Sequence, residues 1–359
     1  MYDVIIVGAG VAGSYLASKL KNINALVIEK DNKIKIKDSG IVSGRIFHFF
    51  KEKRLIKNKI NSMKLYSPNN DISINTKKPF AFILNRDNFS KFLRSKTNEN
   101  AEIIYETAKE IEYSKDFVRV VTNENEYICK LIVGADGANS LVRRSIGIRR
   151  PNLYVGIMAK TNYIIRDNIS IYFNKYYSPD FFSWIIPQND EYGLITALDP
   201  IERLNYFKNK INLPDGEIYA YYIPIGYTKT YGYRTILIGD ACGHVKPITG
   251  GGIIFSLISA KYAADIINNA FKENRIDENF LSQYEKKWKK EFGLEIKKQL
   301  LFRNFYRYTT NRQIDKLFKI IKPTIEKIDY FDYDKLSRLW IKFPKLKLIK
   351  FIFDYFVFD

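Results

Sequence analysis

The sequence predicts a mixed α/β fold: a parallel-sheet domain interleaved with an antiparallel-sheet domain, followed by a short helical region at the C-terminal end. Three observations lead to this prediction. Residues 2–30 read as a strand, a glycine-rich turn, a helix and a second strand. Residues 151–231 then alternate apolar and polar side chains, as the strands of an antiparallel sheet do. A further strand, glycine-rich loop and helix over residues 232–271 indicate that the chain returns to the first domain after the sheet.

Glycines at the first turn supply the clearest signal. The apolar run DVIIV is typical of a buried parallel strand, and GAGVAG follows it at once. Gly8 permits the tight turn, and Gly10 lets a pyrophosphate approach the backbone and the start of the helix. Gly13 lets that helix pack closely on the sheet. This pattern predicts a Rossmann-type dinucleotide-binding domain.

The second strand, NALVIEK, ends in an acidic residue, as the same fold requires. The carboxylate of Glu29 can accept hydrogen bonds from both ribose hydroxyls, and its charge would repel a 2′-phosphate. The fingerprint does not by itself choose between NAD and FAD. Two neighbouring residues complete the contacts expected in this part of the chain: Ala12 and Lys30.

Two later segments each deliver polar residues from a strand end into the start of a helix. FILNRDNFSKFLRSK gives a strand end, Arg86 and an amphipathic helix. KLIVGADGANSLVRRSIG gives a strand, then Asp136 and Gly137 in a loop, then a short basic helix. Arg143 and Arg144 in that helix are expected to form a surface pair.

Four motifs in this order resemble those of a known group of flavin enzymes. They are GAGVAG, the RDNF that starts at Arg86, the ADG that contains Asp136, and the GD formed by Gly239 and Asp240. The set is similar to the enzymes grouped around p-hydroxybenzoate hydroxylase, and within them to the geranylgeranyl reductases. The resemblance covers roughly residues 1–290 and implies FAD as the cofactor.

The resemblance gives the third glycine-rich loop a role. It places Asp240 on the ribitol of FAD, and it places Pro247 along the isoalloxazine ring. Apolar residues at helical spacing predict a helix that begins at Ile253, and its positive N-terminus would face the pyrimidine edge of the ring. Three glycines would lie along the ring, where side chains would clash with it: Gly250, Gly251 and Gly252.

The segment FFSWIIPQNDEYGLITAL resembles the substrate-binding segment of the reductases. The matching residues are Phe182, Trp184 and Pro187, and the resemblance implies that they help line an apolar tunnel for an isoprenoid. Ile186 stands where the family usually has phenylalanine, and only Gly193 of a glycine pair is present. Trp184 could instead be an ordinary core aromatic of a β-sheet.

The catalytic residues stay unknown, with three candidates. The reductases often carry a Cys-Gly pair where this chain has Ser39 and Gly40, and a serine hydroxyl is a far poorer acid than a thiol. His244 could hydrogen-bond near the flavin ring or could simply pack in its loop. Trp184 could position the substrate. Arg45 could contact the cofactor or an anionic head group. No cysteine and histidine spacing predicts a metal site.

The C-terminal region is basic and helical, ending in LWIKFPKLKLIKFIFDYFVFD. This segment could cover the substrate domain, or its apolar residues and lysines could lie on a membrane surface. The predicted division of the chain is an FAD-binding domain, a substrate-binding sheet domain and a helical region. The FAD-binding domain is predicted at residues 1–61, 86–150 and 232–290. The substrate-binding sheet domain is predicted at residues 62–85 and 151–231, and the helical region at residues 291–359.

The composition predicts a cellular compartment but does not identify a binding partner. No stretch approaches the roughly 18 apolar residues that cross a bilayer. Cys129 and Cys242 cannot form a disulfide framework, so we expect a reducing cytoplasm, with peripheral contact at the inner face of the cell membrane as an option. The formal net charge of +19 fits an anionic substrate or lipid surface, or merely a lysine-rich composition. We expect no nucleic-acid partner, because the basic residues show no RNA-binding spacing.

The resemblance implies that reduced FAD delivers hydride to an isolated alkene of a geranylgeranyl chain while a nearby acid adds a proton. The substrate would be an archaeal-type membrane lipid or its diphosphate precursor. Two alternatives stay open: an FAD-dependent monooxygenase of the aromatic hydroxylase type, and a flavin-carrying protein without turnover. No second fingerprint is present, so the electron donor would be transiently bound NAD(P)H or a small ferredoxin-like protein.

Overall fold

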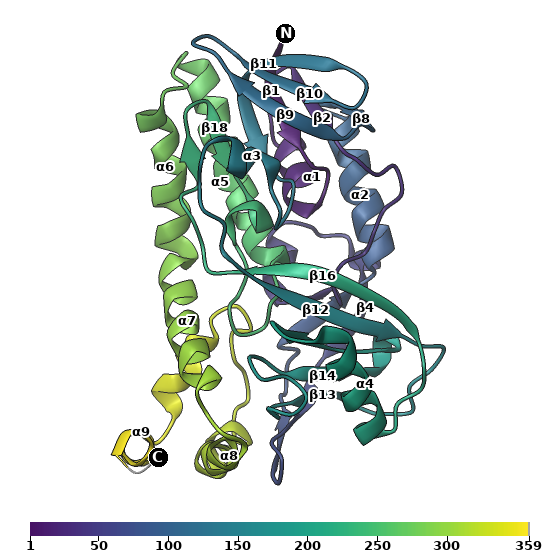
Figure 1. Ribbon diagram of the computed structural model, residues 1–359, viewed down its shortest axis with the longest axis vertical. Helices are drawn as coiled ribbons and strands as arrows, with labels where there is room; N and C mark the ends of the chain where they lie inside the picture. The colour runs from purple at the N-terminus through teal and green to yellow at the C-terminus, as the bar shows by residue number, and fades with distance from the viewer. Residues whose placement is uncertain (358–359) are drawn as a thin grey trace.

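The structure is a computed structural model that describes residues 1–357, with side chains described as far as Phe351. Two large sheets form the two halves of the molecule, and a long helical rod runs along one side of both (Figure 1). The predicted mixed α/β architecture is confirmed. No helix within residues 1–357 is both long and apolar enough to cross a membrane.

An eight-stranded sheet makes up the first half, and its central strands are parallel. Apolar residues on both faces bury these strands, as the continuous hydrophobic runs predict. In order, the strands are β17 (Tyr231–Gly232), β18 (Thr235–Leu237), β11 (Glu126–Gly134), β1 (Tyr2–Val7), β2 (Ala25–Ile28) and β8 (Glu102–Ile104), with β10 (Val118–Thr122) joining β11 to β9 (Ala108–Tyr113).

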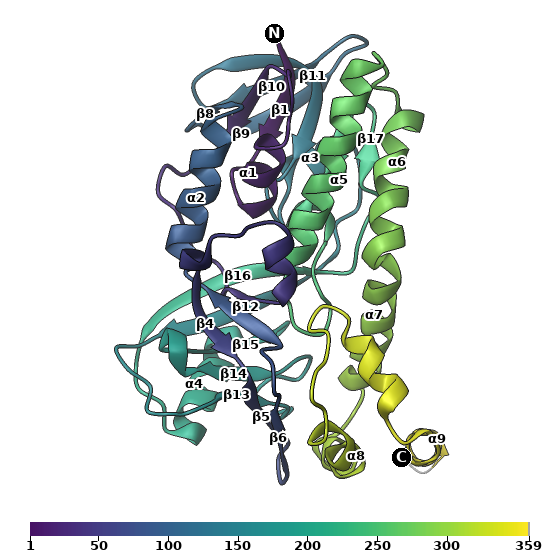
Figure 2. The ribbon, with the colours of Figure 1, turned by 180° about the vertical axis from the view of Figure 1, so that it is seen from behind.

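Helices cover this sheet and start at its loops. On one face, α1 packs between α5 and α2, as Figure 2 shows from behind. The helix α3 lies on the other side, against β9 and β11. Their bounds are α1 (Val11–Ala17), α2 (Arg86–Asn98), α3 (Leu141–Ser145) and α5 (Ile253–Lys272). The helix predicted to begin at Ile253 is confirmed.

A seven-stranded sheet makes up the second half, with α4 (Pro200–Ile211) packed on one face. Neighbouring strands are antiparallel, as the alternating pattern predicts, except that β13 and β5 are parallel. In order, the strands are β16 (Glu217–Ile225), β12 (Asn152–Lys160), β15 (Glu191–Thr196), β14 (Ser183–Ile186), β13 (Ile169–Tyr172), β5 (Ser62–Tyr66) and β6 (Asp71–Asn75).

A small third sheet contains β3 (Ile41–Val42), β7 (Ala81–Leu84) and β4 (Ile56–Ile60). It draws its strands from segments that the sequence assigned to different domains. The domain boundaries given above therefore stay a prediction.

The C-terminal region is helical as predicted, and its last two residues lie outside the described part of the chain. The helices α6 (Glu278–Trp288) and α7 (Leu294–Arg307) join through a π-helical turn (Lys289–Gly293) into the rod. Beyond it lie α8 (Asn311–Ile325), a 3₁₀ turn (Leu336–Lys342) and α9 (Lys345–Val357).

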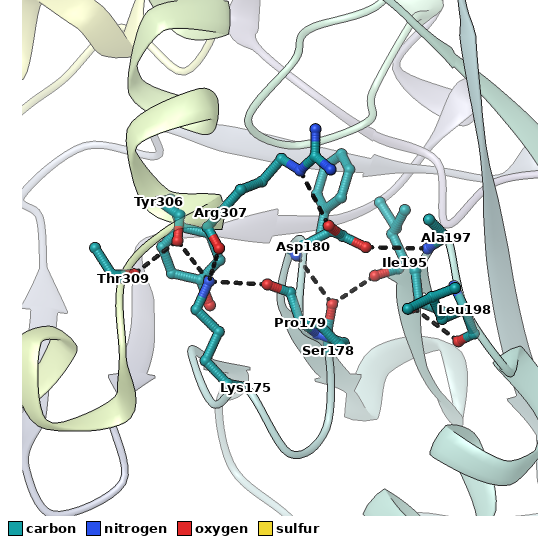
Figure 3. A network of polar contacts seen from close by, with 12 residues as sticks. Lys175, Ser178, Pro179, Asp180, Ile195, Ala197, Leu198, Tyr306, Arg307 and Thr309 are labelled. Atoms are coloured by element: carbon teal, nitrogen blue, oxygen red, sulfur yellow. Dashed lines mark hydrogen bonds and ion pairs between the residues drawn. The ribbon is translucent and has the colours of Figure 1, made fainter.

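A half-buried lysine fixes the lower end of the rod on the second sheet (Figure 3). The Lys175 ammonium donates to the carbonyl oxygens of Pro179 at 2.8 Å and Arg307 at 3.3 Å, and also to that of Tyr306. Asp180 pairs with Arg307 at 3.2 Å beside it. Burial lowers the pKa of Lys175 to about 8, so the three carbonyls must offset the cost of holding a desolvated cation.

His244 packs in the core where the rod meets the first sheet. Its ring centroid lies 4.5 Å from that of Trp288 and 5.2 Å from that of Phe292. The Nδ1 atom lies 3.4 Å from the Cys242 sulfur, and Nε2 is buried without a hydrogen-bond partner among the described residues. Burial lowers the pKa of His244 to about 3. Protonation of this ring would place an unpaired charge among aromatic side chains.

We expect His244 to make folding sensitive to acid. Because its folded pKa of about 3 lies below the ordinary value of 6.5, the unfolded chain binds the proton first as the pH falls. Stability is therefore lost from about pH 6.5 downward. Between about pH 7 and about pH 5.5, FAD-loaded wild type should lose about 1 kcal/mol more than His244→Gln in urea unfolding.

The control for this comparison is His48→Gln, because His48 is exposed and is the other histidine of the chain. That variant should follow wild type. Equal acid sensitivity in all three proteins would contradict the prediction.

Candidate active site

One cavity of about 1110 Å³ joins the two halves of the molecule. It is larger than the roughly 300–1,000 Å³ of ordinary small-molecule sites, so it has room for a cofactor and a second ligand. The predicted cofactor residues on its wall are Gly8, Gly10, Ala12, Glu29, Lys30, Arg86, Asp136, Gly137, Asp240, Gly250, Gly251, Gly252 and Ile253.

The first glycine-rich loop brings bare backbone to the cavity. Gly8 has φ of +103°, and a Cβ there would lie 2.4 Å from the Ala135 carbonyl oxygen. A Cβ at Gly13 would lie 1.9 Å from the Gly8 carbonyl oxygen, so the helix α1 packs directly on the turn. At Gly10 a Cβ would meet no atom within 4 Å and would project into the cavity. Gly10 is also the N-cap of α1 and offers no side chain to the first-turn amides.

Glu29 is held in place at the end of β2. Its Oε2 accepts from the Ala9 amide at 2.7 Å, and its Oε1 accepts from the Asp31 amide at 3.1 Å. The carboxylate therefore holds the glycine-rich turn to the end of the next strand. This is the place where a dinucleotide ribose is bound in the fold.

Asp136 keeps one oxygen without a partner. Its Oδ2 accepts from the amides of Leu141 at 2.6 Å and Val142 at 3.2 Å, at the start of α3. Its Oδ1 is buried and has no hydrogen-bond partner among the described residues, and burial raises the pKa of this carboxyl. A buried acceptor of this kind costs free energy unless a ligand donates to it. The adjacent Gly137, with φ of +80°, has open space where a Cβ would be.

Arg143 joins two of the site loops. Its guanidinium is buried and donates to the carbonyl oxygens of Ala138 at 3.0 Å and Ala241 at 2.8 Å. The expectation of a surface pair is wrong for this residue, because its side chain turns inward between the loops after β11 and β18. Arg144 is exposed and lies on the cavity wall.

The third loop ends at an uncapped helix. Gly239 has φ of +61°, and a Cβ there would lie 3.0 Å from the Ala12 Cβ, so this loop packs against the first. Burial raises the pKa of Asp240 to about 6. Gly252 is the N-cap of α5 and provides no side-chain hydrogen bond. The positive end of α5 is therefore open to the cavity, which favours a ligand with negative charge there.

Arg86 holds the loop that carries Ser39. It pairs with Asp38 through two hydrogen bonds, Nε to Oδ1 at 2.7 Å and Nη2 to Oδ2 at 2.9 Å. Gly40 has φ of +70°, and a Cβ there would lie 2.7 Å from the Arg86 Cγ. Ser39 therefore stands at a fixed point of the cavity wall.

Several predicted residues lie off the cavity wall. Gly13 lets α1 pack on the first glycine-rich turn, and Gly239 packs the third loop against the first, as described above. Arg45 pairs with Glu291 at 3.1 Å, and His244 lies in the core. Pro247 borders a separate pocket of about 20 Å³, and Pro187 borders neither space. The cofactor, substrate and catalytic roles of the whole set stay predictions.

The far half of the cavity is apolar. Phe182 and Trp184 line it from the second sheet, as the resemblance implies, and the C-terminal helices supply most of the opposite wall. Sequence reasoning missed the C-terminal residues, although the apolar spacing within α8 was visible. They are Phe302, Phe305 and Tyr306 of α7; Ile314, Leu317, Phe318, Ile321 and Ile325 of α8; and Phe331, Tyr333, Leu336, Leu339, Trp340, Phe343, Leu348 and Phe351.

Two alanine substitutions should separate packing from ligand binding in the first loop. Gly13→Ala forces the backbone apart and should destabilise the protein by about 1–3 kcal/mol in urea unfolding without cofactor. Gly10→Ala should leave that stability within about 0.5 kcal/mol of wild type. It should nevertheless weaken FAD binding at least about tenfold, measured by flavin fluorescence, because its methyl group enters the cavity. Unchanged FAD affinity in Gly10→Ala would contradict this assignment.

Comparisons with known proteins identify the family of this chain. The FAD binding domain family matches residues 1–208. An uncharacterised protein of Methanocaldococcus jannaschii is 30% identical over 371 residues, covering 96% of this chain and 95% of that protein. A digeranylgeranylglycerophospholipid reductase of Methanothermobacter thermautotrophicus is 25% identical over 373 residues, covering 95% of this chain and 96% of the reductase.

A solved structure shows the same fold. It is a geranylgeranyl bacteriochlorophyll reductase-like protein of Thermoplasma acidophilum, with a TM-score of 0.83 and 19% identity over 95% of both chains. The matched family covers more than half of this chain, and its curated relatives match over nearly the full length. The chain therefore belongs to the FAD-binding-domain family of flavoproteins, and within it to the geranylgeranyl reductases that its motifs resemble.

Proposed function

We propose that this chain saturates isolated C=C bonds of geranylgeranyl chains, carried by archaeal-type membrane lipids or by their diphosphate precursors. The observation that carries the proposal is the shape of the cavity. Its polar end has the glycine-rich loops, and its other end is a long apolar compartment between the second sheet and α7 and α8. The relative from Methanothermobacter, named a digeranylgeranylglycerophospholipid reductase, supports this substrate class.

The residues at the polar end fit FAD. Bare backbone at Gly10 and Gly137 faces open space, and the buried Asp136 Oδ1 lacks a donor. The uncapped start of α5 offers positive charge to the electron-rich ring. Bound FAD, once reduced, supplies a hydride.

At the apolar end of the cavity, the side chains position the alkene and exclude water. An isolated alkene has no polar handle, so only shape can place it beside the cofactor. Trp184 and Phe182 form one side of the compartment, and α8 forms the other. Exclusion of water keeps reducing equivalents from side reactions.

A flavin monooxygenase is the second candidate, because the same motifs serve aromatic hydroxylation. The extended apolar wall favours a prenyl chain over a small aromatic ring. We propose NAD(P)H or a ferredoxin-like protein as the electron donor.

The test is anaerobic turnover. FAD-loaded protein, chemically reduced and mixed with a digeranylgeranylglycerol phospholipid, should yield products heavier by two hydrogens per reduced alkene in mass spectrometry. Oxygen-dependent hydroxylation of an aromatic substrate, without alkene reduction, would support the monooxygenase. Reduced flavin that no substrate reoxidises would support a carrier without turnover.

A bulky substitution should shorten the compartment. Leu317 lines it from α8, whereas Lys319 on the same helix is exposed. We expect Leu317→Trp to lower kcat/KM for a geranylgeranyl lipid at least about tenfold, because the ring fills space that the chain needs. A lipid with shorter, geranyl chains should lose less than about threefold. Lys319→Trp should leave both values unchanged, and equal losses for the two lipids would contradict a length effect.

The end of the chain fits contact with a lipid surface. In α9, Leu348 and Phe351 line the cavity, while Leu346 and Ile349 are 84% and 62% exposed. Exposed lysines surround these apolar side chains: Lys342, Lys345, Lys347 and Lys350. A basic and apolar surface next to a lipid compartment suits an anionic membrane.

This surface should govern vesicle binding. Leu346→Asp with Ile349→Asp should weaken binding to vesicles of anionic phospholipid by roughly tenfold in co-sedimentation, because two apolar side chains no longer enter the interface. The matched control is Leu198→Asp with Ile201→Asp, since these are 57% and 60% exposed near and on α4. The same loss in both double variants would point to charge alone and contradict an α9 docking surface.

A further inference from the structure

A buried carboxyl group stands directly behind the cavity wall. Glu191 begins β15 and is 1% exposed. It accepts a hydrogen bond from the Ser39 hydroxyl and another from the Trp184 indole N–H at 3.3 Å. Both donors line the cavity, whereas Glu191 itself does not. Two cavity-lining side chains, Ser39 and Trp184, therefore link the Glu191 carboxyl group to the cavity by hydrogen bonds.

The surroundings of Glu191 favour its protonated form. Burial is the largest effect and raises the pKa of this carboxyl, the hydrogen bonds from Ser39 and Trp184 lower the pKa, and the charge of Asp38 raises it. Lys160, which faces Glu191 across the β12 and β15 pair, also lowers the pKa of Glu191, although no ion pair joins the two side chains in the described chain. A buried acid without an ion pair is costly to a fold, so its position beside a cavity points to chemistry.

Ser39 is held so that its hydroxyl stays between Glu191 and the cavity. Its carbonyl oxygen accepts from the Asn189 side chain at 2.8 Å. On one side Asp38 is paired with Arg86, and on the other Gly40 rests against the same arginine. A serine hydroxyl can accept one proton while it donates another, so it can pass on a proton without ionising.

We propose that Glu191 is the proton source of the reduction and that the Ser39 hydroxyl relays this proton into the cavity. The inference rests on the proposed function, alkene reduction. It removes the difficulty that serine alone is too weak an acid for the role. Trp184 is a positioning residue in this scheme, because its N–H stabilises the carboxylate left behind.

The step balances in atoms and electrons. The alkene carbon–carbon π bond breaks, one carbon gains the hydride with its electron pair from reduced flavin, and the other carbon gains the Ser39 hydroxyl proton. In the protonated state the Glu191 hydroxyl donates to the Ser39 oxygen, so the hydrogen bond between them is reversed and the Ser39 hydrogen is free to point into the cavity. The Glu191 proton moves to the Ser39 oxygen at the same time, leaving serine neutral and Glu191 ionised. Solvent then returns one proton to Glu191 before the next turnover.

The first test compares three variants of the FAD-loaded protein with wild type. Reoxidation of reduced flavin by the prenyl lipid is followed by absorbance without oxygen. Glu191→Gln and Ser39→Ala should slow it by at least about 100-fold, as expected for loss of a general acid, with unchanged FAD affinity. Ser39→Cys should stay within about tenfold of wild type, because a thiol also passes protons.

The matched control is Glu295→Gln. Glu295 is also buried and also accepts from a serine hydroxyl, that of Ser337 at 2.5 Å, but it does not line the cavity. Its substitution should leave the rate unchanged. A Glu191→Gln rate within about threefold of wild type, or an equal loss in Glu295→Gln, would overturn the relay.

The second test reads the carboxyl group without turnover. Infrared difference spectra of the FAD-loaded protein should show a protonated carboxyl that titrates above the ordinary range of glutamate. This band should vanish in Glu191→Gln and persist in Glu295→Gln. The wild-type reoxidation rate should fall as the pH rises through the same titration, while the residual rate of Glu191→Gln should not. A Glu191 already ionised at neutral pH would overturn the relay. A protonated Glu191 in a protein that reduces no prenyl lipid would overturn the proposed function instead.

Discussion

The close approach of main chain to main chain at three strand ends determines the site. The strands β18, β11 and β1 are neighbours and run parallel, so their carboxyl ends deliver three loops to one edge of the sheet. These loops meet with almost no side chain between them: Gly8 lies against Ala135, and Gly239 against Ala12. Arg143 then fixes two of the loops with hydrogen bonds to their carbonyl oxygens. A dinucleotide can reach the backbone there because the glycines leave room for it.

Features set by local backbone geometry could be predicted from the sequence. Where the backbone must adopt positive φ or must let a neighbouring backbone approach, the sequence has a glycine at that position, so the requirement can be recognised from the residue type. The first loop and the start of α5 could therefore be predicted from the sequence. Alternation likewise predicted the second sheet, although it could not show that β13 pairs in parallel with β5.

Features set by tertiary contacts could not be predicted. Arg143 looks like a surface residue in a basic helix, and only the loop after β18 shows why it is buried. Glu191 follows Asn189 and Asp190 and looks like part of a polar turn, but β14 and β12 pair on both sides of it. The apolar residues of α8 predict a helix, yet nothing in them states that they face a cavity lined also by Trp184.

The cavity must exclude water and must also provide a proton, and these two requirements conflict. An apolar compartment that positions an alkene must exclude water, and water is the usual source of protons. A side chain that stored the proton inside the compartment would need to be acidic, and its charge after transfer would face apolar surface at high cost. The conflict is resolved if the acid lies behind the cavity wall, with the Ser39 side chain between it and the cavity. The negative charge of Glu191 then forms beside the Trp184 N–H and opposite Lys160, away from the lipid chain. Only a neutral hydroxyl, that of Ser39, then needs to face the substrate. A relay through one hydroxyl also tolerates little displacement of that hydroxyl. The two hydrogen bonds from Arg86 to Asp38 hold the Ser39 loop in place and so meet this requirement.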